Sequence, residues 1–371
     1  MKKLAFWKKD DVETKANVSS EESTEVENND SPKAPKLDMK KIIALGVAVV
    51  IGIGAILGIA LGKKDVKDNF TVGIIQLAPH DALDSATQGF KDALTAKLAA
   101  EGKTVEFKYE NAQGDTNTCN TIVNSFVSTN VDLIMANATA ALASAYNATD
   151  KIPILGTSIT EYGVALSLDD FNGTVGGNVS GTSDLAPLAT QAQMMIDTLD
   201  LQAGDKIGLL YCSAEPNSQY QVDVVKAYLT SKGMICTDYK FSDSNDLGAI
   251  TSSAVSASDA IYVPTDNTVA SNTEIINNIA APAKCPIFAG EQDTCKGCGY
   301  ATLAISYYNI GYKTGEMAAE ILLGNAKIED MPIAYDQNSV KKYNKAICEN
   351  LGIDIEALEA AGYTMIEGTD N

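Results

Sequence analysis

The 371-residue sequence contains a single histidine and a single tryptophan, and aromatic residues make up only 6% of it. One histidine excludes reaction mechanisms that need two, and it excludes a histidine-rich metal site. Basic residues are also few, because 28 Lys and Arg stand against 48 Asp and Glu, for a formal net charge of −20. Since nucleic-acid-binding surfaces are basic patches, we expect no nucleic-acid partner.

Sequence motifs of common enzymes are missing too. There is no Gly-x-Ser-x-Gly elbow and no phosphate-binding loop ending in Gly-Lys-Ser/Thr. Nothing in the pattern brings His80 together with Ser158 or Ser213, so His80 is interpreted as a loop or helix-start residue rather than a general base. We therefore predict that the chain is not an enzyme and carries no cofactor.

The seven cysteines are an odd number, so at least one cannot pair within the chain. Cys295 and Cys298 form a C-x-x-C, but a zinc site needs a second such pair, which is missing. Gly297 and Gly299, with Gln-Asp-Thr before the first cysteine, predict a loop here. A loop disulfide, free thiols, and a redox or metal role all stay open for this motif; no metal site is predicted.

The N-terminal part differs sharply from the rest. Residues 1–41 are polar and charged, which predicts a disordered tail. Ile42–Gly62 contains no charge over 21 residues, long enough to cross a bilayer core of about 30 Å. Its end, Ala60-Leu61-Gly62, resembles a signal-peptide cleavage site, but the apolar stretch exceeds a usual signal core. We therefore expect an uncleaved single-pass anchor, with the lysine bias placing the large C-terminal part outside the cell.

From Phe70 onward, short apolar runs alternate with amphipathic helices such as Asp81–Ala100. This alternation predicts α/β architecture, with parallel sheets covered by helices. A second series starts near Lys206, after a polar crossing. We expect two α/β lobes joined by a hinge: lobe 1 over residues 68–183, completed by about 307–371, and lobe 2 over residues 184–306. Two terminal helices are expected at Val340–Asn350 and Asp354–Ala361.

One stretch, Asp259–Val269, shows where a ligand could bind. Its apolar run Ala260–Val263 predicts a buried strand, and Pro264 then leads into a polar segment ahead of a helix. Ligands of open α/β sheets bind at the carboxyl ends of strands. Asp266 is therefore either a helix N-cap or a ligand contact. Helix N-termini at such an edge favour an anionic group. Together these features suit a zwitterion, whose ammonium would pair with Asp266.

Five pieces of the sequence resemble the substrate-binding proteins of ABC transporters, of the tryptophan/tyrosine-binding type. They occur in the expected order and cover nearly all of Phe70–Ala334. The pieces are Phe70–Phe90 (with Val-Gly-Ile-Ile-Gln-Leu-Ala-Pro-His), Gly181–Asp184, Gly208–Ser218 (with Ser-Ala-Glu-Pro-Asn-Ser), Ile261–Val269 and Ala301–Gly311.

The resemblance implies a periplasmic-binding-protein type I fold and a receptor without catalytic activity. Its two lobes would close on a small molecule, expected to be an amino acid and most readily an aromatic one, and deliver it to a permease driven by an ATPase. It also favours Asp266 as a ligand contact. The binding residues implied are Gln76, His80, Asn137, Thr139, Ser158, Thr182, Ser183, Asp184, Ser213, Glu215, Asn217, Ser218, Asp266 and Glu291.

The chain departs from the family pattern in three places. A membrane segment replaces the lipid-attached cysteine, Thr160–Gly163 reads Thr-Glu-Tyr-Gly where members often have Thr-Asp-Pro-Val/Gly, and the Cys295/Cys298 segment lies at the cleft rim. The last two leave the ligand open, including a sugar or a nucleoside. A membrane-anchored ligand sensor of the same fold and a secreted α/β enzyme are the remaining alternatives. A transcription regulator is excluded, because a membrane segment and no helix-turn-helix precedes Phe70.

Overall fold

The computed structural model describes residues 67–336 and 338–369, which lie within one compact unit, Lys63–Asn371. The predicted tail, 1–41, and the predicted membrane segment, Ile42–Gly62, lie outside the described residues. No helix in the described part is both long and apolar enough to cross a membrane.

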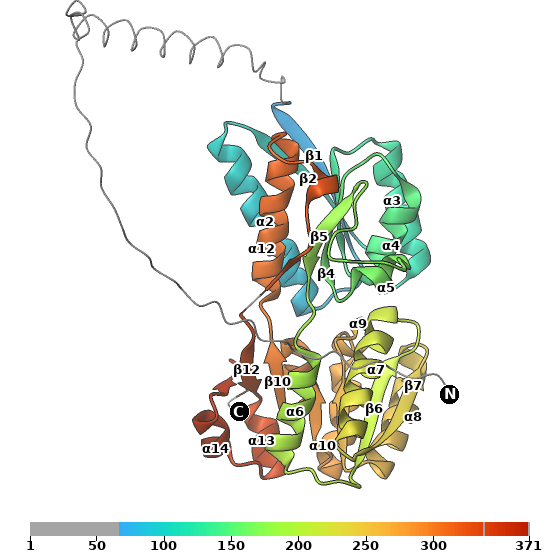
Figure 1. Cartoon of the computed structure of the whole chain (residues 1–371), viewed down its shortest axis with the longest axis vertical. Coiled ribbons are helices and arrows are strands. Elements are labelled where there is room, and N and C mark those ends of the chain that lie inside the picture. The colour runs from blue at the N-terminus through green and yellow to red at the C-terminus, as the bar shows by residue number, and fades with distance from the viewer. Residues whose placement is uncertain (1–66, 337, 370–371) are drawn as a thin grey trace, which may run out of the picture. The chain divides into compact units, whose positions relative to one another are not determined.

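Six parallel strands form the first sheet, in the order β11-β5-β4-β3-β1-β2 (Figure 1). The central strands β3 and β4 are buried along their whole length, as expected of a parallel sheet covered on both faces. The bounds are β1 Asn69–Gln76, β2 Thr104–Asn111, β3 Leu133–Asn137, β4 Ile154–Ile159, β5 Val179–Ser183 and β11 Ala334–Tyr335.

Helices cover the first sheet on both faces because its strands alternate the direction of their apolar side chains. On β1, Val72 and Ile74 pack into the cluster under α2 and α12, whereas Ile75 packs into the cluster under α3 and α4. The helices are α2 Asp81–Ala100 and α12 Tyr307–Leu322 on one face, and α3 Thr116–Ser128, α4 Thr139–Ala148 and α5 Tyr162–Leu166 on the other.

The second sheet has seven strands in the order β13-β12-β10-β9-β8-β6-β7, parallel except where β12 runs antiparallel to β10. Its strands are β6 Lys206–Cys212, β7 Ile235–Phe241, β8 Ala260–Val263, β9 Ile287–Ala289, β10 Ala301–Ala304, β12 Val340–Tyr343 and β13 Thr364–Met365. Its helices are α6 Leu188–Leu199, α7 Pro216–Ser231, α8 Ser244–Ala257, α9 Asn267–Ala270, α10 Thr273–Ala283, α11 Gln292–Cys298, α13 Lys345–Leu351 and α14 Ile355–Ala360, and a short 3₁₀ helix, η1 Ile328–Asp330, follows α12.

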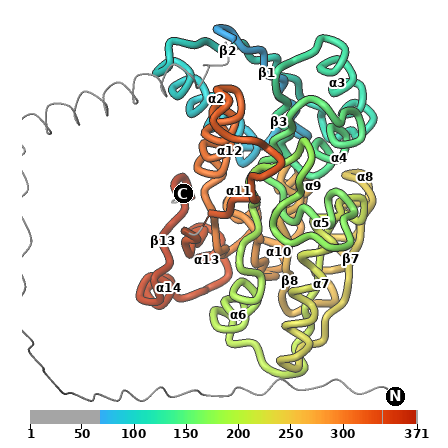
Figure 2. Tube along the Cα trace, turned by 45° about the horizontal axis from the view of Figure 1, so that its top comes forward, coloured from blue at the N-terminus to red at the C-terminus, as the bar shows by residue number. Residues whose placement is uncertain are grey.

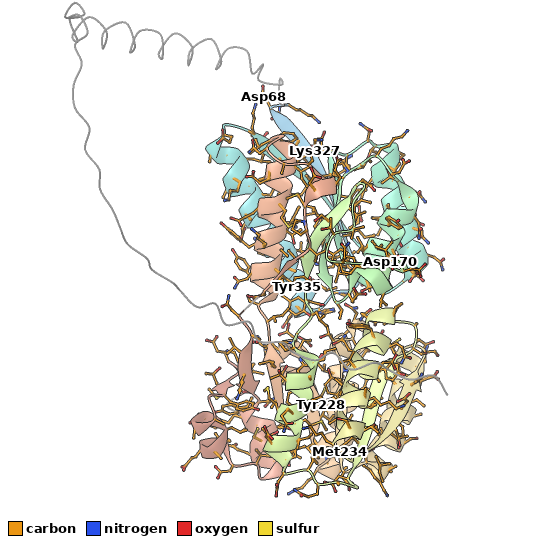
Figure 3. All side chains as sticks on the ribbon, viewed as in Figure 1. Asp68, Asp170, Tyr228, Met234, Lys327 and Tyr335 are labelled. Atoms are coloured by element: carbon orange, nitrogen blue, oxygen red, sulfur yellow. The ribbon has the colours of Figure 1, made fainter. Side chains whose placement is uncertain are left out.

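The chain crosses between the two sheets three times: from β5 to α6, from β10 to α12 and from β11 to β12. Residues of α6 pack in the core of the second sheet, and residues of α12 pack in the core of the first. Tyr335, on β11, lies at the level where the side chains of the two lobes meet (Figure 3). The three crossings therefore join two separate lobes.

The C-terminal segment differs from the sequence-based prediction. Residues 307–371 were expected to complete lobe 1, but only α12 and β11 join the first sheet, and β12 and β13 extend the second. Val340–Tyr343, predicted as helix, is a strand whose residues pair with Ala301–Ala304 of β10. The pairing buries Tyr343 against the core of the second lobe, and Val340 and Tyr343 are themselves of residue types that favour strands.

The C-x-x-C segment also differs from the predicted loop. Gln292–Cys298 is helix α11, and it directly follows β9. The Glu291 side chain caps this helix by accepting hydrogen bonds from the backbone N–H groups of Asp293 and Thr294. An acidic N-cap with two bonded amides is enough to start a short helix despite Gly297.

Glycines allow α2 and α12 to lie side by side (Figures 1 and 2). A Cβ on Gly311 of α12 would overlap the carbonyl oxygen of Ala86 on α2, and a Cβ on Gly89 would overlap that of Tyr308. Both neighbours are backbone atoms, which cannot move aside without separating the helices. Gly311 therefore sets the distance between the first-lobe helix α2 and the helix that returns from lobe 2.

We predict that Gly311→Ala destabilises the fold by about 1–3 kcal/mol, the usual cost of overpacking, measured by urea unfolding. Gly248→Ala is the matched control, because a Cβ there meets Ile275 at an ordinary 3.6 Å inside α8. That variant should gain about 0.5–1 kcal/mol, as alanine does in helices. Equal unfolding free energies for the two variants would contradict the close contact.

Candidate functional site

A narrow cavity lies between the lobes, where strands of both sheets end. About 10 Å³ is open to the centre of a water molecule, which is room for roughly one water. The first lobe and the crossings contribute residues that follow β1, β5 and β10 or lie at the end of β4, and the second lobe contributes residues that follow β6, β8 and β9. The lining residues are His80, Ala82, Leu83, Ser158, Thr160, Asp184, Asn217, Thr265, Asp266, Asn267, Ala270, Glu291 and Tyr307.

On the first lobe, Ser158 is held in an unusual backbone conformation. Its φ is +56°, and the pairing of β4 with β5 shifts register between Gly156 and Ile159. The Ser158 hydroxyl is buried without a hydrogen-bond partner. Leaving a buried polar atom unpaired costs about 1–3 kcal/mol, and local backbone strain of this kind concentrates at functional sites.

The N-terminus of α2 lies beside Ser158 in the cavity wall. His80 is its N-cap residue, yet no side chain caps the helix, and Ala82 and Leu83 of its first turn line the cavity. The first N–H groups of a helix have no partner within the helix. They attract an anionic group.

Asp184 is the carboxyl group with an unused oxygen. It follows β5 at the first crossing, where Oδ2 accepts a hydrogen bond of 3.0 Å from the Tyr307 hydroxyl. Oδ1 is buried and has no partner. Burial raises the pKa of Asp184, and the neighbouring hydroxyls of Thr160 and Tyr307 oppose that rise. A ligand cation is the partner that would favour its ionised form.

Asp266 is an N-cap, and it also lines the cavity. Oδ1 accepts from the N–H of Val269 at 2.9 Å, which caps α9. Oδ2 accepts from the N–H of Cys212 and from the Ser218 hydroxyl. Burial, and then the nearby Glu215, raise the pKa of Asp266 to about 8. The N-cap interpretation of Asp266 is therefore confirmed, and its role as a ligand contact stays a prediction, because both of its oxygens already have partners within the protein.

Glu291 faces the same cavity with its oxygens on the first amides of α11, including a 2.6 Å bond from the N–H of Asp293. Burial raises the pKa of Glu291, against the effect of these hydrogen bonds. Burial, with Glu291 and Asp81 nearby, raises the pKa of Asp293 to about 7. The N–H groups at the start of α11 stabilise a negative charge at this point, but they carry no full positive charge that would neutralise it.

No cation balances these carboxyl groups at the cavity. None of its lining residues is a lysine, and the sequence contains no arginine at all. A ligand carboxylate would therefore depend on N–H and hydroxyl groups. A ligand ammonium would find three carboxyl groups, those of Asp184, Asp266 and Glu291.

The structure brings six of the residues named from the sequence to the cavity: His80, Ser158, Asp184, Asn217, Asp266 and Glu291. Of the others, Glu215 and Ser218 stand behind the wall. Glu215 accepts hydrogen bonds from the N–H groups of Asn267 and Thr268 and from the Asn217 amide. Ser218 donates to Asp266. These two residues form hydrogen bonds with lining residues but do not themselves line the cavity.

Other named residues lie away from the cavity and serve the fold. Gln76 and Asn137 meet the Thr87 hydroxyl under α2. Ser183 donates to the carbonyl of Thr160. Thr139 lies at the start of α4 and is not among the cavity's lining residues.

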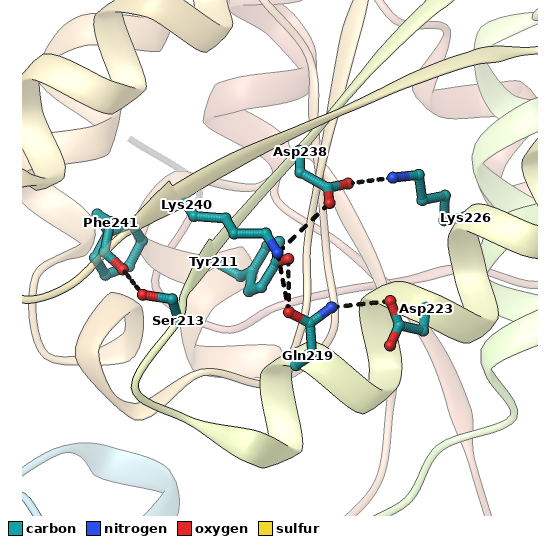
Figure 4. A network of polar contacts seen from close by, with 8 residues as sticks. All are labelled: Tyr211, Ser213, Gln219, Asp223, Lys226, Asp238, Lys240 and Phe241. Carbon is teal, nitrogen blue, oxygen red and sulfur yellow. Dashed lines mark hydrogen bonds and ion pairs between the residues drawn. The ribbon is translucent and has the colours of Figure 1, made fainter.

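Thr182 and Ser213 are also turned elsewhere. The Thr182 hydroxyl lies between those of Thr157 and Thr314, at 3.1 and 2.8 Å. The Ser213 hydroxyl donates to the Phe241 carbonyl at 3.0 Å (Figure 4). Figure 4 shows it beside a surface network centred on Asp238, which pairs with Lys226 at 2.8 Å. Ser213 is exposed and belongs to the outer edge of the second lobe.

Several lining residues were not among those named from the sequence. Tyr307 opens α12, and the sequence pattern could not separate a cleft position from packing between the lobes. Thr265 and Asn267 flank Asp266 in the polar segment after β8, so their position could have been included. Ala82, Leu83 and Ala270 are small or apolar and give no signal in a search for polar strand ends.

Metal binding and thiol chemistry have little support in the described part of the chain. Between residues 67 and 369, leaving aside residue 337, no three His, Cys, Asp or Glu side chains are grouped to hold a metal ion. Every cysteine is free, and Cys295 and Cys298 are buried in and beside the core. Burial raises the pKa of both thiols, which suppresses the reactive thiolate form.

Comparison with known proteins connects this site to a family. A model of the family described as ABC transporter substrate binding protein matches residues 71–361. A tyrosine-binding protein of Clostridioides difficile is 34% identical over 345 residues, which cover 90% of this chain and 97% of that protein.

Two solved structures share both the lobes and substantial identity. An ABC domain in complex with L-Trp from Streptococcus pneumoniae is 30% identical, with a TM-score of 0.73 over 80% of this chain and 100% of that one. The ligand-free, open structure of a substrate-binding protein with adhesive properties from Clostridium difficile is 34% identical, with a TM-score of 0.60 over the same shares. In shape, this chain is thus more similar to the ligand complex. The chain belongs to the family of ABC transporter substrate-binding proteins.

Proposed function

We propose that this protein binds an aromatic L-amino acid in the cavity between its lobes and delivers it to a membrane permease. The observation that carries the proposal is the unpaired oxygen of Asp184, buried in a cavity without a lysine or arginine. A buried carboxyl oxygen with no donor is costly, and the ammonium of an amino acid supplies the missing donor and charge. Ser158 and the uncapped start of α2 supply donors for the carboxylate.

The arrangement separates the two charges of an α-amino acid. The carboxylate lies toward the first lobe, on the first amides of α2 and the Ser158 hydroxyl. The ammonium lies toward the crossing and the second lobe, on Asp184 with Glu291 nearby. Ala82, Leu83, Ala270 and Tyr307 remain as apolar or aromatic contacts for a ring.

The aromatic assignment rests on relatives, described as binding tyrosine and found in complex with L-Trp. A ring does not fit into about 10 Å³, so ligand entry requires the lobes to separate and the lining to move. Such hinge motion is common among proteins built of two lobes around a ligand. Delivery to a permease and its ATPase follows from the family, and in this proposal Ile42–Gly62 anchors the receptor at the outer face of the membrane.

L-Tyrosine and L-tryptophan should raise the melting temperature of the full chain, measured by thermal shift. Since a ligand that binds only the folded state adds about 2.7 kcal/mol at a hundredfold excess over its Kd, the shift should be several degrees. Tyramine, without the carboxylate, and 3-(4-hydroxyphenyl)propionate, without the ammonium, should shift it far less. Absence of a shift with all twenty amino acids would refute the proposal.

Asp184→Asn should weaken binding of the aromatic amino acid about tenfold to a hundredfold, measured by isothermal titration calorimetry. The range reflects about 1.5–3 kcal/mol for a hydrogen bond between charged groups. Stability without ligand should stay the same or rise, because a buried carboxyl group with a raised pKa is removed. Asp150→Asn, at an exposed position of lobe 1, changes the net charge equally and should leave affinity unchanged. Wild-type affinity in Asp184→Asn would contradict its role.

The free protein should melt at a lower temperature at pH 8 than at pH 5. Burial raises the pKa of Asp266 to about 8 and of Asp293 to about 7. A raised carboxyl pKa contributes stability at low pH, and this is lost as pH rises through the folded-state pKa. Since an ammonium favours ionised carboxylates, the ligand-induced shift should grow over the same interval. Asp266→Asn should flatten the slope of the free protein; a slope of the opposite sign would contradict the analysis.

A further inference from the structure

A hydrogen bond joins the side chains of His80 and Asn267 across the cavity. His80 precedes α2 in the first lobe, and Asn267 is the first residue of α9 in the second. His80 Nε2 and Asn267 Oδ1 are 3.2 Å apart. His80 is the only histidine of the sequence, so any signal or titration of an imidazole in this protein comes from this residue.

Glu215 determines the direction of this hydrogen bond. Its Oε2 lies 2.7 Å from Asn267 Nδ2 and 3.0 Å from the Asn267 backbone nitrogen. A carboxylate only accepts hydrogen bonds, so the amide must turn its NH₂ group to Glu215 and its oxygen to His80. The oxygen also only accepts. Nε2 therefore carries the proton, and in a neutral imidazole the lone pair is then on Nδ1.

The surroundings of His80 favour the neutral ring. Burial lowers the pKa of His80, opposed by the hydrogen bond to Asn267 and by the negative charges of Asp293, Glu215 and Asp84. These acids belong to α11, to the loop before α7 and to α2. Because burial is the largest of these effects, the imidazole stays neutral near pH 7.

Nδ1 is buried without any hydrogen-bond partner, and His80 lines the cavity. The lone pair thus needs a donor, and no side chain of the described residues supplies one. An ammonium or a hydroxyl group of a ligand would supply it. A ligand that has only acceptors or apolar atoms at this point would leave the lone pair unpaired, at a cost in affinity.

We propose that His80 is a positioning residue for the ligand, and that Asn267 sets its tautomer from the opposite lobe. The proposal rests on the function proposed above. When the lobes are closed, Nδ1 offers an acceptor to a donor group of the ligand. When they separate, the bond to Asn267 breaks and the proton can occupy either ring nitrogen. Ligand binding and closure then stabilise each other through one imidazole, as linkage requires.

The test uses the full chain, prepared without a polyhistidine tag and labelled with ¹⁵N only in histidine. Its ring gives one pair of nitrogen signals, and long-range ¹H–¹⁵N spectra show which nitrogen is protonated. With saturating L-tyrosine, we expect a single tautomer with the proton on Nε2. Asn267→Ala should give a mixture of tautomers and bind L-tyrosine about tenfold more weakly, while melting as a folded protein.

Asn217→Ala is the matched control. Asn217 also donates to Glu215 Oε2, at 3.2 Å, but it forms no hydrogen bond with His80, so the Nε2–H tautomer should persist. Asn267→Ser replaces Asn267→Ala if the alanine variant does not fold. A proton on Nδ1, or a charged ring, in the liganded wild type would overturn the proposal. So would an Asn267 variant in which either the tautomer or the L-tyrosine affinity is that of the wild type.

Failure of the proposed function gives a different result. If neither L-tyrosine nor L-tryptophan shifts the melting temperature of the wild type, the amino-acid assignment is wrong. The free proteins then decide the role of Asn267. An Nε2–H tautomer that is lost in Asn267→Ala supports the bridge between the lobes, and a free wild-type protein with the proton fixed on Nδ1 overturns it.

Discussion

Burial of three carboxyl groups between the lobes, without any lysine or arginine beside them, is the constraint on which this molecule depends. Isolated buried carboxylates are costly, and proteins offset the cost with hydrogen bonds or opposite charges. Two of the three groups use helix termini: Asp266 caps α9 and Glu291 caps α11. Asp184 accepts from the Tyr307 hydroxyl on one oxygen, has the Thr160 hydroxyl nearby, and has no hydrogen-bond partner on the other oxygen. Asp184 is therefore the carboxyl group whose burial is least compensated, and in the proposed function the ligand binds beside it.

In the proposed function, the uncompensated burial of the Asp184 carboxyl group also links ligand binding to the movement of the lobes. Asp184 lies at a crossing, whereas Asp266 and Glu291 belong to the second lobe. In this structure the three carboxyl groups line one small cavity, and the lobe closure proposed above would bring them together there. A ligand ammonium favours that closed arrangement, because a ligand shifts an equilibrium by its differential affinity for the two states. The similarity in shape to a complex with L-Trp, greater than to an open, ligand-free relative, agrees with the lobes being closed in this structure.

Sequence reasoning found the features that depend on local patterns. The apolar spacing of Asp81–Ala100 gave the bounds of α2, and the polar residues after β8 and β9 led to Asp266 and Glu291. It could not decide between neighbours on a strand end: Thr182 points to Thr314 in the core, whereas Asp184 points to the cavity. The pleat does not separate residues two apart, since they share a face of the strand; the difference is that β5 ends at Ser183, so that Asp184 lies beyond the sheet edge. The strand at Val340–Tyr343 was missed because its partner β10 is distant in the chain.

In the proposed function, the polar groups that would recognise the ligand therefore lie at one part of the site and the apolar contacts at another. Backbone amides of α2 and the acids around Asp184 are fixed by helix and strand ends, so in the proposed function recognition of the α-amino and α-carboxyl groups would depend on the fold itself. In the proposed complex the ring would meet Ala82, Leu83 and Ala270, which line the cavity and offer apolar contact but no directional bonds. A tyrosine ring differs from a tryptophan ring in the position of its donor. Because the Nδ1 atom of His80 is a buried acceptor whose direction is set by Asn267 and Glu215, the position of a donor is a property this site can discriminate.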